Sequence, residues 1–248
     1  MADSLAGVAL GAGSGQRMRP LTIDRPKVLC PIDGVALVDH AIRRLEAVTA
    51  DIAVNAHVTQ PSLSEHLDGR VHVSIESGEQ LGTAGALGQL RPWIDGRPTV
   101  VVNGDTWCPG GIDALVDGWG GTTIRILVAG REPFGPRSRI AGALLSWSDV
   151  VRLEAVPTGL WEVSWRAALA EGRIESVHHE GPFVDCATPS DYLAANLEAA
   201  GGSSICAGAV VDGTIVDCVV WDGAVVHAAE QLERAIRTDT GRTVLIRD

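Results

Sequence analysis

Short apolar runs alternate with segments of helical periodicity along the first half of the chain. The runs that we interpret as strands are 5–12, 51–54, 71–75, 99–102 and 123–128. The helical segments between them are 38–48, 61–67, 83–90 and 113–119. Because strands alternate with helices, the pattern predicts βαβ units. The fold class that follows is α/β, with a Rossmann-like, mostly parallel sheet and helices on both faces.

The alternation continues to about residue 200 and then changes. We expect a loop at 131–138, a strand at 140–147, helices at 161–170 and 189–200, and a strand at 176–179. The helix at 189–200 has a clear start signal, since Thr188 can cap it and Pro189 suits its first turn.

Beyond Gly201-Gly202, apolar clusters recur about every five residues between Asp-Gly and Asp-Cys turns. They predict a C-terminal β-rich tail over 201–248, appended to a main domain over 1–200. The tail is either a stub of left-handed parallel β-helix, whose unit is a six-residue repeat, or a β-meander. Either form presents an edge suited to self-association, so we expect a homodimer.

Composition excludes several classes of protein. The chain has 248 residues, of which 46% are hydrophobic and 21% charged, as in a soluble globular protein. Its net charge of −11 argues against general nucleic-acid binding. No apolar run approaches the length of a membrane span, and no secretory signal is evident. The cysteines number five, with no CxxC pair, which favours reduced thiols and a cytoplasmic protein.

Positive charge is concentrated near the N-terminus. The cluster consists of Arg17, Arg19, Arg25 and Lys27, and Lys27 is the only lysine beside nineteen arginines. A compact ammonium and a planar guanidinium are not equivalent, so this single lysine indicates a site that needs a point charge. A lysine retained by chance on the surface is the alternative.

The segment before this cluster is rich in glycine. Gly11, Gly13 and Gly15 follow the first predicted strand, with Ser14 between them. Such a loop lets backbone N–H groups approach a phosphate closely, although an ordinary structural turn has the same composition. It is neither a Walker P-loop nor a GxGxxG fingerprint. Asn103-Gly104-Asp105 follows another predicted strand, and both segments fall where parallel sheets bind ligands, beyond the carboxyl ends of the strands.

Four segments in order resemble the motifs of the sugar-1-phosphate nucleotidyltransferases. They are LGAGSGQRMRPLT with Pro26-Lys27 (10–27), EQLGTAGAL (79–87), Asn103-Gly104-Asp105, and FVDCATPSDY (183–192). The second segment is most similar to the guanylyl- and uridylyltransferase branches. The resemblance implies a nucleotidyltransferase domain over 1–200 that transfers a nucleotidyl group from a nucleoside triphosphate to a sugar-1-phosphate and releases pyrophosphate.

The resemblance also implies roles for individual residues. Arg17 would hold the departing β- and γ-phosphates, and Lys27 would bridge the α-phosphate and the sugar phosphate. Asp105 and Asp185 would coordinate Mg²⁺. Nucleotide binding would involve Leu10, Gly11, Ala12, Gly13, Ser14, Gly15, Gln80, Gly82 and Thr83.

The chain departs from the family pattern in its sugar-binding region. The usual Glu-Lys-Pro segment is missing, and Arg139, Arg152 or Arg166 could take over part of its duty. Gly142 corresponds to a sugar-contacting turn of the family, with the usual Asn replaced. Two other functions therefore stay open. One is a noncatalytic relative that binds nucleotide-sugars and regulates a partner, and the other is a cytidylyltransferase acting on a phosphorylated alcohol.

Overall fold

The computed structural model describes residues 5–247, which divide into two compact units. Unit 1 comprises the chain up to Gly13 together with residues 40–104 and 108–183. Unit 2 comprises residues 14–39, 105–107 and the chain from Val184 onward. The chain therefore passes from one unit to the other inside the glycine loop and again inside Asn103-Gly104-Asp105.

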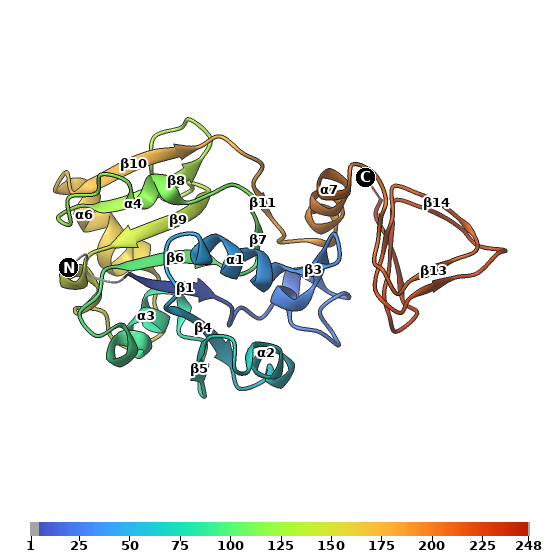
Figure 1. Cartoon of the computed structure of the whole chain (residues 1–248), viewed down its shortest axis with the longest axis horizontal. Helices are drawn as coiled ribbons and strands as arrows, with labels where there is room; N and C mark the ends of the chain where they lie inside the picture. Colours follow the sequence, from blue (N-terminus) through green and yellow to red (C-terminus); the bar gives the residue numbers. More distant parts are fainter. Residues whose placement is uncertain (1–4, 248) are drawn as a thin grey trace. The chain divides into compact units, whose positions relative to one another are not determined.

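Unit 1 is built on a seven-stranded sheet with the order β10-β8-β9-β6-β1-β4-β5 (Figure 1). Its strands are β1 (Ala6–Leu10), β4 (Ile52–His57), β5 (His72–Glu76), β6 (Thr99–Asn103), β8 (Ile124–Ala129), β9 (Ile140–Leu145) and β10 (Ile174–His179). Only β9 runs antiparallel to its neighbours, β6 and β8. The other pairs are parallel, which confirms the predicted mostly parallel sheet.

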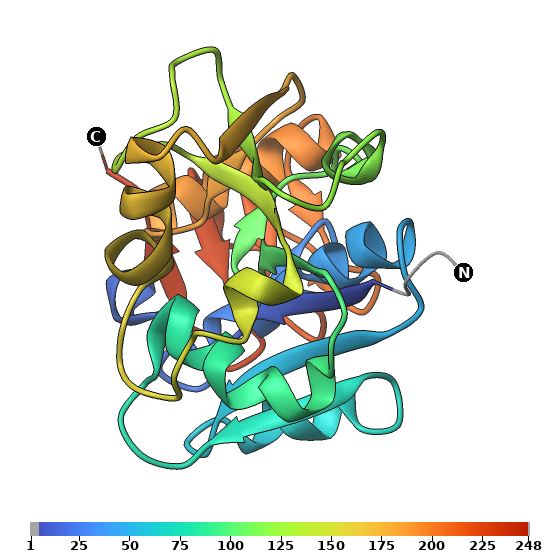
Figure 2. The ribbon, with the colours of Figure 1, turned by 90° about the vertical axis from the view of Figure 1, so that its left-hand side faces the viewer.

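Helices cover both faces of this sheet (Figure 2). They are α1 (Leu37–Glu46, in unit 1 from His40), α2 (Pro61–Leu67), α3 (Gly82–Ile94), α4 (Asp113–Val116), α5 (Trp147–Val150), the π-helical turn η3 (Trp161–Trp165) and α6 (Arg166–Ala170).

The sequence of β1 shows how the two faces are filled. Ala6 and Val8 face a core that also contains the apolar side of α3 and residues of α6. Gly7 points the opposite way, because side chains alternate along a strand. There a Cβ on Gly7 would lie 3.3 Å from the side chain of Leu45 in α1. A strand buried on both faces has to be apolar throughout, as β1 is.

Several element boundaries differ from the sequence prediction, and two of the differences have a clear structural cause. Helix α3 continues through Pro92 to Ile94, four residues beyond the expected end, and Ile94 is fully buried in the unit 1 core. Strand β9 ends at Leu145 instead of Trp147, because Ser146 caps α5 by accepting a hydrogen bond from the N–H of Asp149. Core packing and a capping hydroxyl account for these two differences.

Unit 2 combines short elements with the C-terminal tail. Its first elements are the 3₁₀ turns η1 (Gln16–Met18) and η2 (Lys27–Leu29), then β2 (Pro31–Ile32), β3 (Val35–Ala36), β7 (Thr106–Trp107), β11 (Val184–Asp185) and α7 (Pro189–Ala200). Helix α7 begins and ends as predicted, and Thr188 and Asp191 form a reciprocal capping box at its start.

The tail is a short β-helix. Its strands are β12 (Ser204–Ile205), β13 (Val210–Val211), β14 (Thr214–Val216), β15 (Val219–Val220), β16 (Val225–Val226), β17 (Gln231–Glu233), β18 (Ala235–Arg237) and β19 (Thr243–Leu245). Strands from successive coils pair in parallel, as β13 does with β16 and β14 with β17, whereas a meander would pair neighbours antiparallel. Val210 pairs with Val225, so one coil of the tail spans 15 residues. Three full six-residue repeats would be longer, and the period of the sequence is therefore imperfect.

The five cysteines are all free and buried. Within residues 5–247, no helix combines the length and the apolar character that a membrane crossing requires.

Candidate active site

The single lysine of the chain lies between two carboxylates in unit 2. Lys27 Nζ is 2.7 Å from Oδ2 of Asp105 and 3.6 Å from Oδ1 of Asp185. The side chain of Lys27 is 6% exposed, whereas those of Asp105 and Asp185 are 34% and 55% exposed. The ammonium is therefore fixed in place, while both carboxylates keep oxygen atoms open to solvent.

Local pairing explains why two aspartates that are 80 residues apart in the sequence meet at one lysine. Strands β7 and β11 form an antiparallel pair in which Asp185 lies opposite Thr106. Asp105 immediately precedes Thr106 in the chain, so the pairing sets the two carboxylates side by side.

The glycine loop holds the lysine stem. Gly15 has a φ of +61°, which favours glycine, and a Cβ there would lie 2.9 Å from Cβ of Lys27. Thr22 fixes the loop by donating a hydrogen bond from its hydroxyl to the carbonyl of Gly15, at 2.8 Å. Any larger residue at position 15 would therefore displace Lys27.

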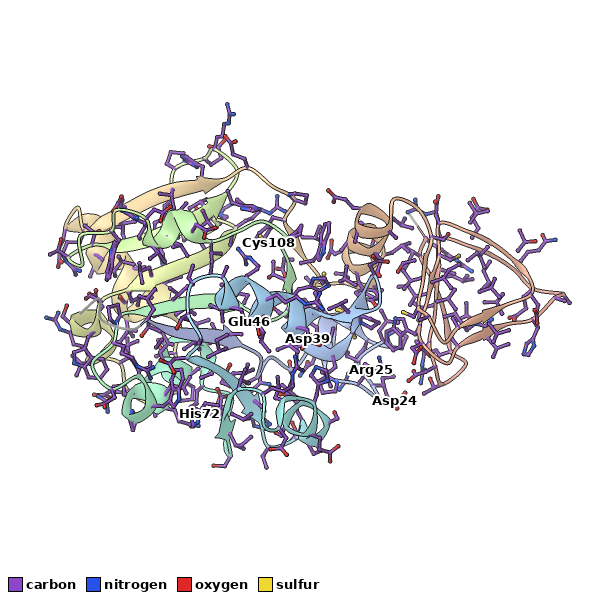
Figure 3. All side chains as sticks on the ribbon, viewed as in Figure 1. Asp24, Arg25, Asp39, Glu46, His72 and Cys108 are labelled. Carbon is purple, nitrogen blue, oxygen red and sulfur yellow. The ribbon has the colours of Figure 1, made fainter. Side chains whose placement is uncertain are left out.

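The other cations of the basic cluster have different environments. Arg17 is exposed and makes no hydrogen bond or ion pair with any residue between 5 and 247. Arg25, which is labelled in Figure 3, is engaged elsewhere in unit 2. Its Nη2 lies 2.6 Å from Asp239 Oδ2, and its guanidinium stacks on Trp221. Of the residues that the sequence grouped together, Arg17 and Arg19 are exposed and without an ion pair in the described part of the chain, whereas Lys27 is paired with Asp105 and Asp185.

Two thiols near Lys27 lie in surroundings that disfavour the nucleophilic thiolate. Burial raises the pKa of the Cys30 and Cys186 thiols to about 12, and the nearby Lys27 only partly offsets this effect. A nucleophilic cysteine needs a lowered pKa, so both thiols are structural.

The donor set of Asp105 and Asp185 fits Mg²⁺. No group of three or more His, Cys, Asp or Glu side chains within the described part of the chain could hold a metal by itself. Mg²⁺ commonly binds through one or two carboxylates and completes its shell with water and substrate phosphates. Two partly exposed carboxylates meet that requirement, and a closed protein cage is unnecessary.

In unit 1, the first glycine of the loop has a structural partner. The Gly11 N–H donates to Asn55 Oδ1 at 2.8 Å, and Asn55 Nδ2 donates to Glu76 Oε1 at 2.7 Å. The second oxygen of Glu76 accepts from the Leu81 N–H at 3.0 Å. The expectation that the Gly11 N–H would bind an anion is therefore wrong, because a buried amide already occupies it.

The following N–H groups are available instead. The N–H groups of Ala12, Gly13, Ser14 and Gly15 make no hydrogen bond within the described residues. Two carbonyl groups of this loop accept hydrogen bonds from side chains. Gln80 Nε2 donates to the Ala12 carbonyl at 2.8 Å, and Gln60 Nε2 donates to the Gly13 carbonyl at 3.2 Å. Successive free N–H groups in a fixed loop are the arrangement that binds phosphate oxygens.

Several of the predicted residues line one cavity of about 240 Å³ in unit 1. Leu10 and Asn103 come from the carboxyl ends of β1 and β6, and Thr83 and Gly142 from α3 and β9. The remaining lining residues are Val101, Val102, Ile140, Ala143, Gly159, Leu160, Trp161, Glu162 and Trp165. The cavity therefore lies at the ligand-binding edge of the sheet.

A strap of residues 154–158 runs across α3 and leads into this cavity. A Cβ on Gly82 would lie 2.7 Å from the Thr158 carbonyl, and Cβ atoms on Gly85 and Gly88 would overlap the backbone of Val156 and Glu154. The Leu160 N–H then donates to Thr83 Oγ1 at 2.8 Å. Glycine at every third helical position thus lets the strap lie directly on the helix backbone.

Comparison with known proteins agrees with this geometry. The family described as Nucleotidyl transferase matches residues 6–119. N-acetylmuramate alpha-1-phosphate uridylyltransferase of Caulobacter vibrioides is 27% identical over 232 residues, which cover 78% of this chain and 96% of that protein. Mannose-1-phosphate guanyltransferase of Aspergillus fumigatus is 26% identical over 223 residues, 74% of this chain and 61% of that protein. The chain is thus similar to sugar-1-phosphate nucleotidyltransferases, and its residues 6–119 match the nucleotidyl transferase family model.

A solved structure supports the fold. A Bacillus anthracis protein described as a glucose-1-phosphate thymidylyltransferase, in complex with a sucrose, superposes with a TM-score of 0.67 at 18% identity. The match covers 79% of this chain and 95% of that one. The likeness in fold therefore extends well beyond residues 6–119.

Several residues of the candidate site are not indicated by the sequence. Asn55, Gln60 and Glu76 are 4%, 7% and 1% exposed, so they are buried polar residues whose hydrogen bonds hold the glycine loop. For 161–165 the sequence predicts only the start of a helix over 161–170. The glycine spacing at 82, 85 and 88 is a signal for the strap, because it lets the neighbouring backbone of residues 154–158 lie on α3.

None of the three arginines suggested as substitutes for the missing Glu-Lys-Pro segment lines the cavity. Arg139 stacks on Phe183 with its guanidinium 4.7 Å from the ring centre. Arg152 lines a separate cavity, and Arg166 is the exposed first residue of α6.

Proposed function

We propose that this protein transfers a nucleotidyl group from a nucleoside triphosphate to a sugar-1-phosphate in a Mg²⁺-dependent reaction. The products would be a nucleotide-sugar and pyrophosphate. The relatives named above include a uridylyl- and a guanylyltransferase, and the EQLGTAGAL segment of this chain is of the same type, so UTP and GTP are the proposed donors.

The proposal depends on one observation. The ammonium of Lys27, the only lysine of this chain, lies between two partly exposed carboxylates. The reaction joins two phosphates, so repulsion between anions has to be overcome at the point where they meet. Lys27 is proposed to neutralise the α-phosphate and the incoming sugar phosphate there. Arg17, exposed and unpaired within the described residues, is proposed to bind the β- and γ-phosphates with its planar fork.

Mg²⁺, held by Asp105 and Asp185, would neutralise charge on the triphosphate. The glycine-loop N–H groups after Gly11 are proposed to receive phosphate oxygens. Gln80, Gly82 and Thr83 are proposed to position the nucleoside.

The bond changes need no general base. A sugar-1-phosphate oxygen attacks the α-phosphorus and forms a new P–O bond. The bond from the α-phosphorus to the oxygen that bridges it to the β-phosphate breaks, and pyrophosphate leaves with that electron pair. Because the attacking phosphate is already ionised, the protein residues have to bind, align and neutralise charge.

The test is a matrix of the four nucleoside triphosphates, CTP included, against a panel of sugar-1-phosphates, scored by pyrophosphate release with Mg²⁺ present. Phosphocholine serves as the non-sugar acceptor. Pyrophosphate release that depends on both a sugar-1-phosphate and a triphosphate supports the proposal. Calorimetric binding of nucleotide-sugar without any release would instead identify a regulatory relative, and activity with phosphocholine alone would identify a different acceptor.

A further inference from the structure

The cavity in unit 1 has an unusual charge pattern. Two tryptophans, Trp161 and Trp165, contribute aromatic surface, and Glu162 between them is the only charged lining residue. No Arg, Lys or His lines this cavity. A ligand in the cavity would therefore meet a carboxylate and no cation.

The Glu162 carboxylate is free to interact with a ligand. It makes no hydrogen bond or ion pair with any residue between 5 and 247. Its Oε2 lies over Gly159 so closely that a Cβ at that position would overlap it. Glu162 belongs to the π-helical turn η3. Such turns are rare in proteins, and those that occur are often found at functional sites.

Other polar groups of the lining suit hydroxyl groups. The side-chain amide of Asn103 is unpaired within the described residues and can both donate and accept. The hydroxyl of Thr83, which is proposed to position the nucleoside, already accepts a hydrogen bond from the Leu160 N–H. The Asn103 amide, the Glu162 carboxylate and the aromatic surface match an uncharged ring that carries several hydroxyls.

The size of the cavity limits the ligand as well. Pockets for drug-sized ligands measure about 300–1,000 Å³, and this one measures about 240 Å³. A single monosaccharide ring is in keeping with that volume.

We infer that the acceptor is the 1-phosphate of an uncharged sugar, and that Glu162 selects against sugars that carry a carboxylate. This inference rests on the proposed function. An acidic sugar would bring a second negative charge beside Glu162, an exposed residue of η3, and two like charges a few ångströms apart repel each other even at the surface of a protein. The Caulobacter relative is named for N-acetylmuramate, an acidic sugar, so the inference separates this chain from that relative.

The experiment compares matched acceptor pairs that differ in a carboxylate: glucose-1-phosphate against glucuronate-1-phosphate, and N-acetylglucosamine-1-phosphate against N-acetylmuramate-1-phosphate. The nucleoside triphosphate is the best donor in the matrix above. We expect kcat/KM for the neutral member to exceed that for the acidic member by about tenfold or more, a factor that corresponds to about 1.4 kcal/mol. The difference should appear mainly in KM, because the repulsion acts on the bound ground state.

Two variants test whether Glu162 causes the difference in kcat/KM between neutral and acidic sugars. Glu162→Gln keeps the shape and an acceptor oxygen but removes the charge, so it should raise kcat/KM for the acidic sugars and reduce the ratio severalfold. Glu132→Gln, which removes one exposed charge of unit 1 away from the cavity, should leave the ratio unchanged. Near-equal use of acidic and neutral sugars by the unmodified protein, or an unchanged ratio in Glu162→Gln, would overturn the inference while the proposed function stands. Absence of pyrophosphate release with every acceptor would overturn both.

Discussion

Lys27 Nζ and Asp105 Oδ2 lie 2.7 Å apart, so the only lysine ammonium of the protein is bound to a residue that we propose as a metal ligand. Asp185, the second proposed ligand, lies 3.6 Å from the same nitrogen. Two carboxylates thus share one buried ammonium, and the group as a whole carries one negative charge. A cation added with the triphosphate can bind to the carboxylate oxygens that remain exposed.

Replacing Lys27 tests its proposed role in catalysis. Lys27→Ala should reduce kcat for pyrophosphate release by about a hundredfold or more, because it removes a fixed positive charge from the transition state. Lys27→Arg should also be impaired, since a planar guanidinium cannot take the place of a compact, buried ammonium 2.7 Å from Asp105 and 3.6 Å from Asp185. Arg19→Ala is the matched control, because Arg19 is an exposed cation of the same segment. Near-normal turnover in Lys27→Ala would remove this residue from the mechanism.

Replacing the aspartates tests the proposed metal site. Asp105→Asn and Asp185→Asn should each raise the Mg²⁺ concentration needed for half-maximal activity by about tenfold or more, because an amide is a weaker ligand for a hard cation. Mn²⁺ binding followed by calorimetry in the presence of nucleotide gives a readout that is independent of turnover. Asp68→Asn, an exposed aspartate outside the site, should behave as the unmodified protein does. Unchanged metal dependence in both site variants would contradict the assignment.

Glu76 should matter for nucleotide affinity although it lies 1% exposed beneath the loop. In Glu76→Gln, one amide N–H₂ would face either the Leu81 N–H or Asn55 Nδ2, and two donors cannot pair. We expect a loss of about 1–3 kcal/mol in the free energy of unfolding and a higher KM for the nucleoside triphosphate. Exposed Glu79, three residues later, provides the control Glu79→Gln. A variant with unchanged KM and unchanged stability would show that the network does not hold the loop.

Replacing glycines of α3 should disrupt the packing of this helix against the strap 154–158. Gly85→Ala and Gly88→Ala would each place a Cβ into the backbone of the strap 154–158. We expect each to lower the free energy of unfolding by about 1–3 kcal/mol, measured by denaturant unfolding. Gly120→Ala is the control, since its Cβ would meet no atom within 4 Å. Equal stabilities of Gly88→Ala and Gly120→Ala would show that the strap does not lie on the helix.

Stability should decrease in alkaline solution. Burial raises the pKa of the Cys30 and Cys186 thiols from 9.0 to about 12 in the folded protein. Between these values the unfolded chain has lost thiol protons that the folded chain retains, so the free energy of unfolding falls as pH rises. Each thiol contributes a loss of roughly 1.4 kcal/mol per pH unit above 9. Urea unfolding at pH 8, 9 and 10 measures the slope, and Cys186→Ala should make it shallower. A pH-independent midpoint across this range would contradict the burial of these thiols.

Parts of this structure were accessible from the sequence because they depend on local chemistry. Helix α7 could be predicted to the residue, since Thr188, Pro189 and Gly201-Gly202 mark its ends without help from the rest of the chain. The first strand and the helix at 61–67 were identified from apolar runs and periodicity alone. The end of α3 was misjudged because the burial of Ile94, which carries the helix past Pro92, is a property of the core.

The candidate site also combines features that the sequence indicates with features that only the fold decides. Lys27, Asp105 and Asp185 were singled out by residue type and motif, and the pairing of β7 with β11 brings them together. No local pattern could indicate that Asn55 binds the Gly11 N–H or that Trp161 and Glu162 line a cavity with Leu10. These contacts join residues that are tens of positions apart in the chain.

By itself, the sequence determined the alternation of strands and helices, the positions of the motifs that we propose to bind phosphate, and the distinct character of the tail. Each of these depends on residues close together in the chain. The tertiary structure decided which N–H groups of the loop are free, which carboxylates surround Lys27 and which charge lines the cavity. Those properties arise from strand pairing and side-chain burial between distant segments, and local composition does not encode them.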